Sequence, residues 1–388
     1  MSFLLLPCVV QSLLPTHPYN YNCKPQLSYD SSKRCTRIDN GDDAKVVNRL
    51  VIFGLGNIGS SVATTTTSQS SILGSDSTPF FEHVCGTTRS SSKDTPDVQA
   101  IRFEDYQELA ENLKKCTHIL VTIPPVKSSA DFDCNLGDIV IGGRRRRWTY
   151  FCDPILNHPK FSLNELVPSN TWIGYISSTS VYGNHDGEWV TEVSEVRCES
   201  GTKGELYFKA ENEWRYAARE FGWRLHVFRA SGLYGNTRSA LHTVRNGDFD
   251  ESAYRSGSED VFTSRIHEED ATRAIIAAMK CNQPLAGDSC LWNLADDHPA
   301  SRSEVMMFGK SLLEEANLLP HKSLESKAIL MRSQRNQSER ARRRSIDKKR
   351  VQNQKMKSLL LADGLMYPTY QEGLLSILDI NRQEWSNR

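Results

Sequence analysis

The sequence predicts an α/β fold built on a doubly wound parallel sheet, with a smaller C-terminal lobe on the substrate side. Two observations support this prediction. A short apolar run, Arg49–Phe53, is followed at once by the glycine-rich segment Gly54-Leu-Gly-Asn-Ile-Gly59. Further apolar runs of strand length then alternate with helix-like segments, which is the pattern of repeated strand-helix-strand units.

Composition excludes several classes of protein. The 388 residues contain 47 Lys and Arg and 47 Asp and Glu, so no global basic field attracts nucleic acid or an anionic membrane. No apolar run is long enough to span a membrane. The ten cysteines form no CxxC pair, which favours buried free thiols in a reducing compartment over a zinc or dithiol site. The composition is compatible with a homo-oligomer as well as with a monomer.

Residues 1–48 are expected to lie outside the fold, because they show no periodicity. The first 29 residues contain no Asp or Glu. Import sequences are acid-poor in this way, but this segment lacks their Arg content and charged start. Two alternatives remain: import into a plastid or another organelle, or a disordered extension of a cytoplasmic protein.

The glycine segment has the GxGxxG spacing in the setting that a dinucleotide requires, after a strand and at the start of a helix. Gly54 allows the tight turn, Gly56 allows the backbone to approach a pyrophosphate, and Gly59 allows the helix to pack against the strand. Asn57 and Ile58 lie in the same loop. We therefore predict a Rossmann-type site in which these five residues bind the cofactor.

A second strand is predicted at His83–Thr88, and Arg89 stands at its end. In a dinucleotide fold an acidic residue at that place binds the ribose of NAD, whereas an Arg nearby accommodates a 2′-phosphate. The sequence therefore favours NADP as the cofactor, with NAD as the alternative. The competing interpretation is an Arg that ends the strand and faces solvent.

The remaining elements follow in order and build the rest of the sheet. Val98–Phe103 is a strand, Asp105–Lys115 a helix and His118–Ile123 a strand; Trp172–Ile176, Arg224–Phe228 and Cys290–Ala295 complete the set. Ligands bind beyond the carboxyl ends of such strands. Further cofactor contacts are therefore expected from residues at the ends of these strands or after them, namely Thr122, Pro124, Ser177 and Tyr234.

Three stretches interrupt the regular pattern and are expected to be surface loops, partly disordered. They are the Ser- and Thr-rich residues 64–79, residues 127–151 and residues 319–346. The last stretch is basic, and we interpret it as a solvated face; the alternative is a patch for nuclear import or for nucleic acid, against which the balanced net charge argues. The expected domains are a dinucleotide-binding part at 49–235 and a substrate-side lobe at 236–388, whose residues 261–300 return to the core.

These motifs together resemble the extended short-chain dehydrogenase/reductase superfamily, in its NAD(P)-dependent epimerase/dehydratase-like branch and an atypical subgroup within it. The resemblance covers most of residues 49–388. The motifs that support it are the glycine segment, Ser177-Ser-Thr-Ser-Val-Tyr-Gly183, Phe228-Arg-Ala-Ser-Gly-Leu-Tyr-Gly235, Ser264-Arg-Ile-His-Glu-Glu-Asp270 and Tyr367-Pro-Thr-Tyr-Gln-Glu-Gly373.

The resemblance implies a catalytic serine at Ser178, whose hydroxyl would bond a substrate carbonyl or hydroxyl. Active members then carry a YxxxK pair in which the Lys lowers the pKa of the Tyr. In the corresponding window this chain has the reverse order, Lys203 followed by Tyr207. On a helix these two residues are neighbours, so Tyr207 remains the candidate acid/base and Lys203 its partner.

The resemblance also places Arg229 and Arg265 on the substrate side. His267 and Asp270 stand at the start of an expected helix, where we predict a structural role. No second His lies at ligand spacing, so no metal site is predicted.

Two functions remain open. The first is an NAD(P)-dependent oxidoreductase that transfers hydride to or from a small hydroxyl or carbonyl substrate, a nucleotide sugar among the candidates. The second is an NADP-binding sensor or scaffold that has lost the chemistry.

Overall fold

The structure of the chain is a computed structural model. It describes residues 47–72, 79–89, 98–126, 139–141, 144–146, 153–249, 261–281, 290–319 and 348–386. All of them belong to one unit of the chain, residues 35–388. The leader predicted at 1–48 and the basic stretch at 319–346 lie almost wholly outside these ranges.

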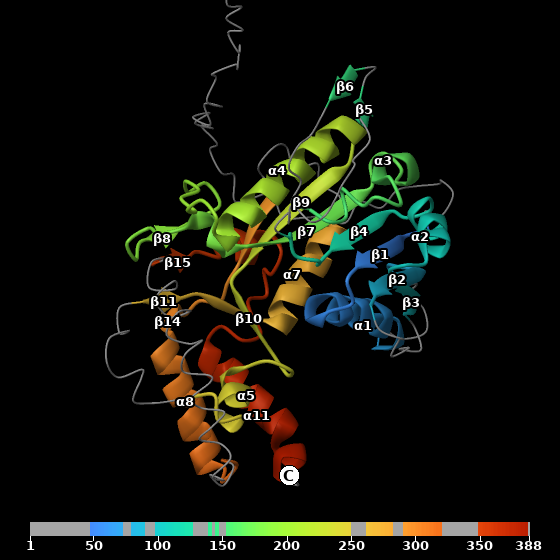
Figure 1. The fold of residues 1–388 in the computed structure, drawn as a ribbon. Coiled ribbons are helices and arrows are strands. Elements are labelled where there is room, and N and C mark those ends of the chain that lie inside the picture. The colour runs from blue at the N-terminus through green and yellow to red at the C-terminus, as the bar shows by residue number, and fades with distance from the viewer. Residues whose placement is uncertain are drawn as a thin grey trace, which may run out of the picture. The chain divides into compact units, whose positions relative to one another are not determined.

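A seven-stranded parallel sheet organises the structure (Figure 1). Its strands follow the order β13-β9-β7-β4-β1-β2-β3 and all run parallel. Successive strands are added on one side of β1 up to β3 and on its other side from β4 onward, so the predicted doubly wound α/β fold is confirmed. The strands are β1 Arg49–Phe53, β2 His83–Thr88, β3 Gln99–Arg102, β4 His118–Val121, β7 Trp172–Ser178, β9 Arg224–Ala230 and β13 Leu291–Leu294.

Helices cover both faces of the sheet because successive strand residues point to opposite sides. Leu50 and Ile52 of β1 pack on one face, whereas Val51 and Phe53 pack on the other. The first face is covered by α1 (Asn57–Ile72) and α7 (Glu268–Lys280). The second is covered by α2 (Tyr106–Leu113), α3 (Leu163–Leu166) and α4 (Lys203–Phe221).

A smaller helical lobe stands beyond the carboxyl ends of the strands. Its core is formed by α5 (Ala240–Arg245), α8 (Arg302–Glu315) and α11 (Tyr370–Ser386). Short strands connect it to the sheet: β10 (Gly232–Tyr234) pairs with β12 (Arg265–His267), and β11 (Phe262–Thr263) pairs with β14 (Ala300–Ser301).

The segment 348–359 returns from this lobe to the edge of the large sheet, and we call it the strap. Its β15 (Arg350–Val351) pairs with β8 (Trp189–Val190), and α10 (Gln354–Leu359) follows. Val351 N donates to Ser264 Oγ at 2.9 Å, and Asn353 Nδ2 donates to Ala295 O at 2.8 Å. The strap therefore joins β8, the residue between β11 and β12, and the segment that follows β13.

Two of the expected surface loops contain regular structure, which corrects the prediction. Helix α1 continues to Ile72 through the Ser- and Thr-rich residues 64–72, although these residues have modest helix propensity. Packing of α1 on α7 and the back-bonding of Thr66 Oγ1 to Val62 O and Ala63 O hold this part. Within 127–151, β5 (Ile139–Ile141) and β6 (Arg144–Arg146) form an antiparallel pair.

The predicted strands of the sheet are confirmed, with small differences at their ends. β1 and β2 have the expected bounds, while β7 and β9 each run two residues further. Within the described ranges, no helix combines the length and the hydropathy needed to cross a membrane.

Candidate functional site

The glycine loop between β1 and α1 has the backbone geometry that a dinucleotide requires. Gly54 adopts φ +97°, in the region that favours glycine. A Cβ at Gly59 would overlap the carbonyl of Gly54, so the helix packs against the loop at that point. A Cβ at Gly56 would meet nothing within 4 Å. The loop thus leaves open space at Gly56 beside the N-terminus of α1, and it fits a pyrophosphate.

Neighbouring strand ends hold this loop rigid. Gly54 N donates to Thr87 Oγ1 at 2.9 Å, and Thr122 Oγ1 donates to Gly54 O at 2.7 Å. Thr87 was not among the predicted site residues, although it is the last buried residue of β2. Thr122, predicted to contact the cofactor, uses its hydroxyl to position the loop, and Pro124 lies exposed after β4.

The other predicted cofactor residues differ in their position. Arg89 is exposed at the end of β2, and it forms no ion pair with any residue of the described ranges. Asn57 is exposed, and its Nδ2 donates to Thr237 Oγ1 at 3.0 Å. The side chain of Ile58 is 6% exposed and packs in the core between α1 and the sheet, so only its backbone is open to a ligand.

Ser177 and Ser178 point to opposite faces of the sheet, which corrects the expectation that both line the site. Ser177 is buried, and its Oγ donates to Glu211 Oε1 of α4 at 2.6 Å. Strand alternation places Ser178 on the other face, the one that carries α1. Ser178 Oγ accepts the backbone N–H of Ser180 at 3.2 Å. Its hydroxyl proton therefore remains available for a substrate oxygen.

Arg229 forms a buried ion pair instead of the predicted substrate contact. Its Nε and Nη2 donate to Glu211 at 3.0 and 2.8 Å, and its guanidinium lies 4.6 Å from the centre of the Tyr182 ring. Glu211 is fully buried, which would raise its pKa, but Arg229, Arg215 and Ser177 hold the pKa below its ordinary value. The pair aligns the carboxyl ends of β7 and β9.

Glu211 is the residue that sequence reasoning missed. It lies on the apolar stripe of α4 together with Trp214 and Ala218, at helical spacing. An acidic residue at a core position of this kind predicts a buried cationic partner. That signal was present in the sequence, but it did not identify Arg229, which belongs to another element.

Tyr207 and Lys203 are neighbours on the first turns of α4, as predicted. Lys203 Nζ lies over the Tyr207 ring, 6.0 Å from its centre. Burial raises the pKa of Tyr207 above its ordinary value. The expected lowering of this pKa by the ammonium is therefore not found.

Tyr234 and Arg265 make their contacts within the small lobe and its short strands. Tyr234 is 8% exposed and belongs to the core of α8 and α11, so its ring does not line the glycine loop. Arg265 Nη1 donates to the backbone oxygens of Thr263 and Ala300 at 2.6 and 2.8 Å. These bonds fix the guanidinium between β11 and β14.

His267 and Asp270 have structural contacts, as predicted. His267 caps α7, and its Nδ1 accepts the backbone N–H of Glu269. Asp270 is fully buried and accepts the backbone N–H groups of Met366 and Tyr367 at 2.8 and 2.9 Å. In the part of the chain that the structure describes, no three His, Cys, Asp or Glu side chains gather in a way that suits a metal ion.

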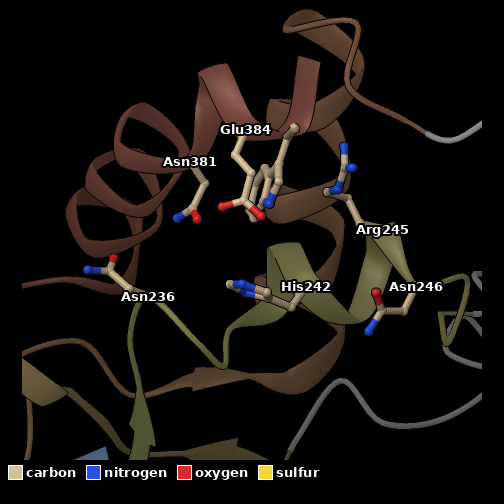
Figure 2. A pocket seen from close by; sticks show the side chains of 7 residues that line it. Asn236, His242, Arg245, Asn246, Asn381 and Glu384 are labelled. Atoms are coloured by element: carbon tan, nitrogen blue, oxygen red, sulfur yellow. The ribbon is translucent and has the colours of Figure 1, made fainter. Parts of the chain in front are cut away.

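A polar cavity of about 290 Å³ lies between α5 and α11. Figure 2 shows His242 and Arg245 of α5 on one side, with Asn381 and Glu384 of α11 on the other. Asn236, in the loop after β10, closes one end. The cavity thus extends to Asn236, which directly precedes Thr237 in the chain, and Thr237 is the residue that accepts the hydrogen bond from Asn57.

Comparison with solved structures places this arrangement among known folds. A conserved protein of unknown function from Silicibacter pomeroyi has 21% sequence identity and a TM-score of 0.56, with 86% of this chain and 99% of that chain covered. A putative NAD-dependent epimerase/dehydratase from Methylobacillus flagellatus has 17% identity and a TM-score of 0.54, with 87% and 100% covered. The chain has the fold of the extended short-chain dehydrogenases/reductases.

A UDP-glucuronic acid 4-epimerase from Bacillus cereus, solved with UDP-glucuronic acid and NAD, shares this fold. It has 17% identity and a TM-score of 0.56, with 87% of this chain and 99% of that chain covered. Neither the protein-family models nor the curated proteins include a match. The resemblance seen in the sequence is thus confirmed at the level of the fold.

Proposed function

We propose that the protein is an NAD(P)-dependent oxidoreductase of the epimerase/dehydratase type, acting on a hydroxyl or carbonyl group of a small substrate. The observation that supports this most directly is the glycine loop, which is open at Gly56 and closed at Gly59. A nucleotide sugar is the proposed substrate class, because structures with this fold contain UDP-sugars beside NAD.

The chain's own residues would hold a dinucleotide at the carboxyl edge of β1 and β2. Backbone N–H groups at the start of α1 face the open space at Gly56 and favour a phosphate there. Arg89, exposed at the end of β2, is the proposed partner of a 2′-phosphate, which makes NADP the proposed cofactor. A bound nicotinamide supplies the hydride acceptor or donor.

Ser178 is proposed to orient the reacting oxygen of the substrate by donating its hydroxyl proton. Tyr207 is proposed to accept the proton of a substrate hydroxyl during oxidation and to return it during reduction. A raised pKa keeps the phenol protonated at neutral pH, which suits the reducing direction better than the oxidising one.

A second candidate function is a dinucleotide-binding sensor or scaffold without turnover. The observation that favours it is the position of Lys203, whose ammonium lies over the Tyr207 ring while burial keeps the pKa of that Tyr high. A site without an activated phenol retains cofactor binding and loses hydride chemistry.

The test combines binding and turnover in the full-length protein. Calorimetric titration with NADPH and NADH is expected to show tighter binding of NADPH. Arg89→Ala is expected to lower the ratio of the NADPH affinity to the NADH affinity by about tenfold or more. Arg102→Ala, at the exposed end of the next strand, is the matched control. If wild type and Arg89→Ala bind NADPH with equal affinity, Arg89 is not the partner of the 2′-phosphate.

Turnover is then followed with a panel of UDP- and dTDP-sugars in wild type, Ser178→Ala and Tyr207→Phe. Absorbance at 340 nm detects net oxidation or reduction, and chromatography of the sugar nucleotides detects reactions that return the hydride to the substrate. Losses of about 100-fold or more in kcat for both variants support the oxidoreductase. NADPH binding without turnover of any substrate in the panel supports the sensor instead. Absence of binding to any dinucleotide overturns both functions.

A further inference from the structure

A tight turn after β10 approaches the glycine loop from the small lobe. Gly235 N donates to Arg238 O at 2.9 Å and Arg238 N donates to Gly235 O at 3.2 Å, so Asn236 and Thr237 form the tip. We call residues 235–238 the clasp turn. It stands 180 positions from Asn57 in the sequence, yet Asn57 Nδ2 donates to Thr237 Oγ1 at 3.0 Å. The turn therefore lies beside the start of α1.

The clasp turn is braced from the other side by α7. Glu268, the first residue of that helix, accepts the backbone N–H of Asn236 at 3.0 Å through Oε1. A Cβ at Gly235 would overlap the Glu268 carboxyl group, so only glycine fits there without displacing the brace. Two helix starts thus hold the turn in one place: Asn57 of α1 and Glu268 of α7.

The glycine loop lacks a cationic side chain of its own. Gly54-Leu-Gly-Asn-Ile-Gly59 contains no Lys or Arg, and the first turn of α1 contains no acidic residue that would repel an anion. The helix start alone supplies partial charges. A diphosphate carries two negative charges, so a full positive charge from another element would increase its binding considerably.

Most arginines near the strand ends already have partners. Arg229 donates to Glu211, and Arg265 donates to the carbonyls of Thr263 and Ala300. Arg238 differs from them, because it is exposed and forms no ion pair or side-chain hydrogen bond with any residue in the described ranges. It follows Thr237 directly, so its backbone lies next to the contact with Asn57.

We propose that the clasp turn completes a diphosphate site with the glycine loop, in which Arg238 is the cationic residue and the Asn57–Thr237 hydrogen bond sets the distance between the two parts. The proposal rests on the proposed function, because it deepens the same cofactor and substrate site. The ligand chemistry is a diphosphate diester, and it has two sources in that function: the dinucleotide and a nucleotide-sugar substrate.

The experiment measures binding of ADP-ribose and of UDP-glucose, separately, to the full-length protein by calorimetry. Arg238→Ala is expected to weaken one or both ligands about 10- to 100-fold, the range for a charge-assisted hydrogen bond to phosphate. Arg238→Lys retains the charge without the bidentate geometry and is expected to recover part of the affinity. Thr237→Val removes the acceptor for Asn57 and is expected to weaken the same ligand by several-fold.

Arg219→Ala, an exposed arginine in the last turn of α4, is the matched control, and melting temperatures verify that each variant is folded. A loss confined to ADP-ribose assigns the site to the cofactor, and a loss confined to UDP-glucose assigns it to the substrate. If wild type binds either ligand and Arg238→Ala binds it equally well, the proposal is wrong while the proposed function stands. If wild type binds neither ligand, the proposed diphosphate site is wrong, and the titration with NADPH and NADH decides the proposed function separately.

Discussion

Gly56 and Gly59 are only three residues apart, but a side chain would have different consequences at each. A Cβ at Gly56 enters open space, whereas a Cβ at Gly59 meets the carbonyl of Gly54 and the side chain of Ile52. The packing of α1 therefore requires glycine at Gly59 but not at Gly56, where we propose that the open space takes the ligand. The spacing of GxGxxG predicted the close packing found at Gly59, and the ligand contact that it predicts at Gly56 stays a prediction.

We expect Gly56→Val to abolish measurable dinucleotide binding while its melting temperature stays within a few degrees of wild type. Gly59→Ala is expected to lower stability by about 1–3 kcal/mol through overpacking. Calorimetry and thermal unfolding of the two variants distinguish these effects. Retained binding in Gly56→Val would contradict the proposed position of the pyrophosphate.

Asp296 illustrates what burial does to a single carboxyl group. It is 1% exposed at the end of β13, and its Oδ2 has no hydrogen-bond partner within the described ranges. Burial raises its pKa from 3.8 to about 8, with Arg265 opposing the rise. Between these two values the unfolded chain loses a proton that the folded chain keeps, so the stability contributed by this group is lost as the pH rises.

Replacing Asp296 by Asn removes that titration. The free energy of unfolding of Asp296→Asn, relative to wild type, is expected to increase from pH 4 to pH 8, by at most about 1.4 kcal/mol for each pH unit. Urea unfolding at several pH values measures this slope. A difference between the two proteins that does not change with pH would refute the raised pKa.

At the level of elements, the pair Glu211–Arg229 joins α4 to β7 and β9. Ser177, Arg229 and Asn293 stand opposite one another on three adjacent strands. Glu211 reaches Ser177 and Arg229 from the helix above them. This arrangement fixes the strand end that carries Ser178, although Glu211 itself lies on the opposite face of the sheet.

Glu211→Gln is expected to cost about 3–5 kcal/mol of stability, because it leaves the buried Arg229 without a compensating charge. The matched control is Glu195→Gln in the exposed pair with Arg197, where the expected cost is below about 1 kcal/mol. Chemical denaturation compares the two variants. Equal costs would show that the buried pair contributes no more than a surface pair.

The elements of the sheet were predictable for a physical reason. Strands buried on both faces, such as Leu50–Phe53 and His118–Val121, are continuous apolar runs, which single sequences reveal well. The last two residues of β7 and β9 were missed because Ser177, Ser178 and Arg229 are polar. Their partners come from other elements, and periodicity within one segment contains no information about such contacts.

At the level of the whole molecule, two buried histidines link the fold to pH. His118 and His226 lie on either side of Trp172 in the core. Burial lowers the pKa of His118 to about 4 and that of His226 to about 3. Because the unfolded chain binds protons below about pH 6.5 and the folded chain does not, the stability from these groups is lost as the pH falls.

We expect the free energy of unfolding to fall between pH 6.5 and pH 4 by at most about 1.4 kcal/mol per pH unit for each histidine, less any opposing contribution from Asp296. The double variant His118→Gln, His226→Gln should show a flatter profile over this range in urea unfolding. A profile as steep as that of wild type would assign the acid sensitivity to other groups.

The strap has a consequence for the order in which the molecule is made. Its residues 350–351 pair with β8 at 189–190, and they are synthesised about 160 positions later. During translation the loops at Ser264 and Ala295 therefore leave the ribosome before their hydrogen-bond partners in the strap exist. Long-range pairing of this kind is slow to form and leaves unsatisfied backbone exposed in the meantime. Until residue 353 emerges, the loops at Ser264 and Ala295 lack the hydrogen bonds that the strap supplies in the folded protein.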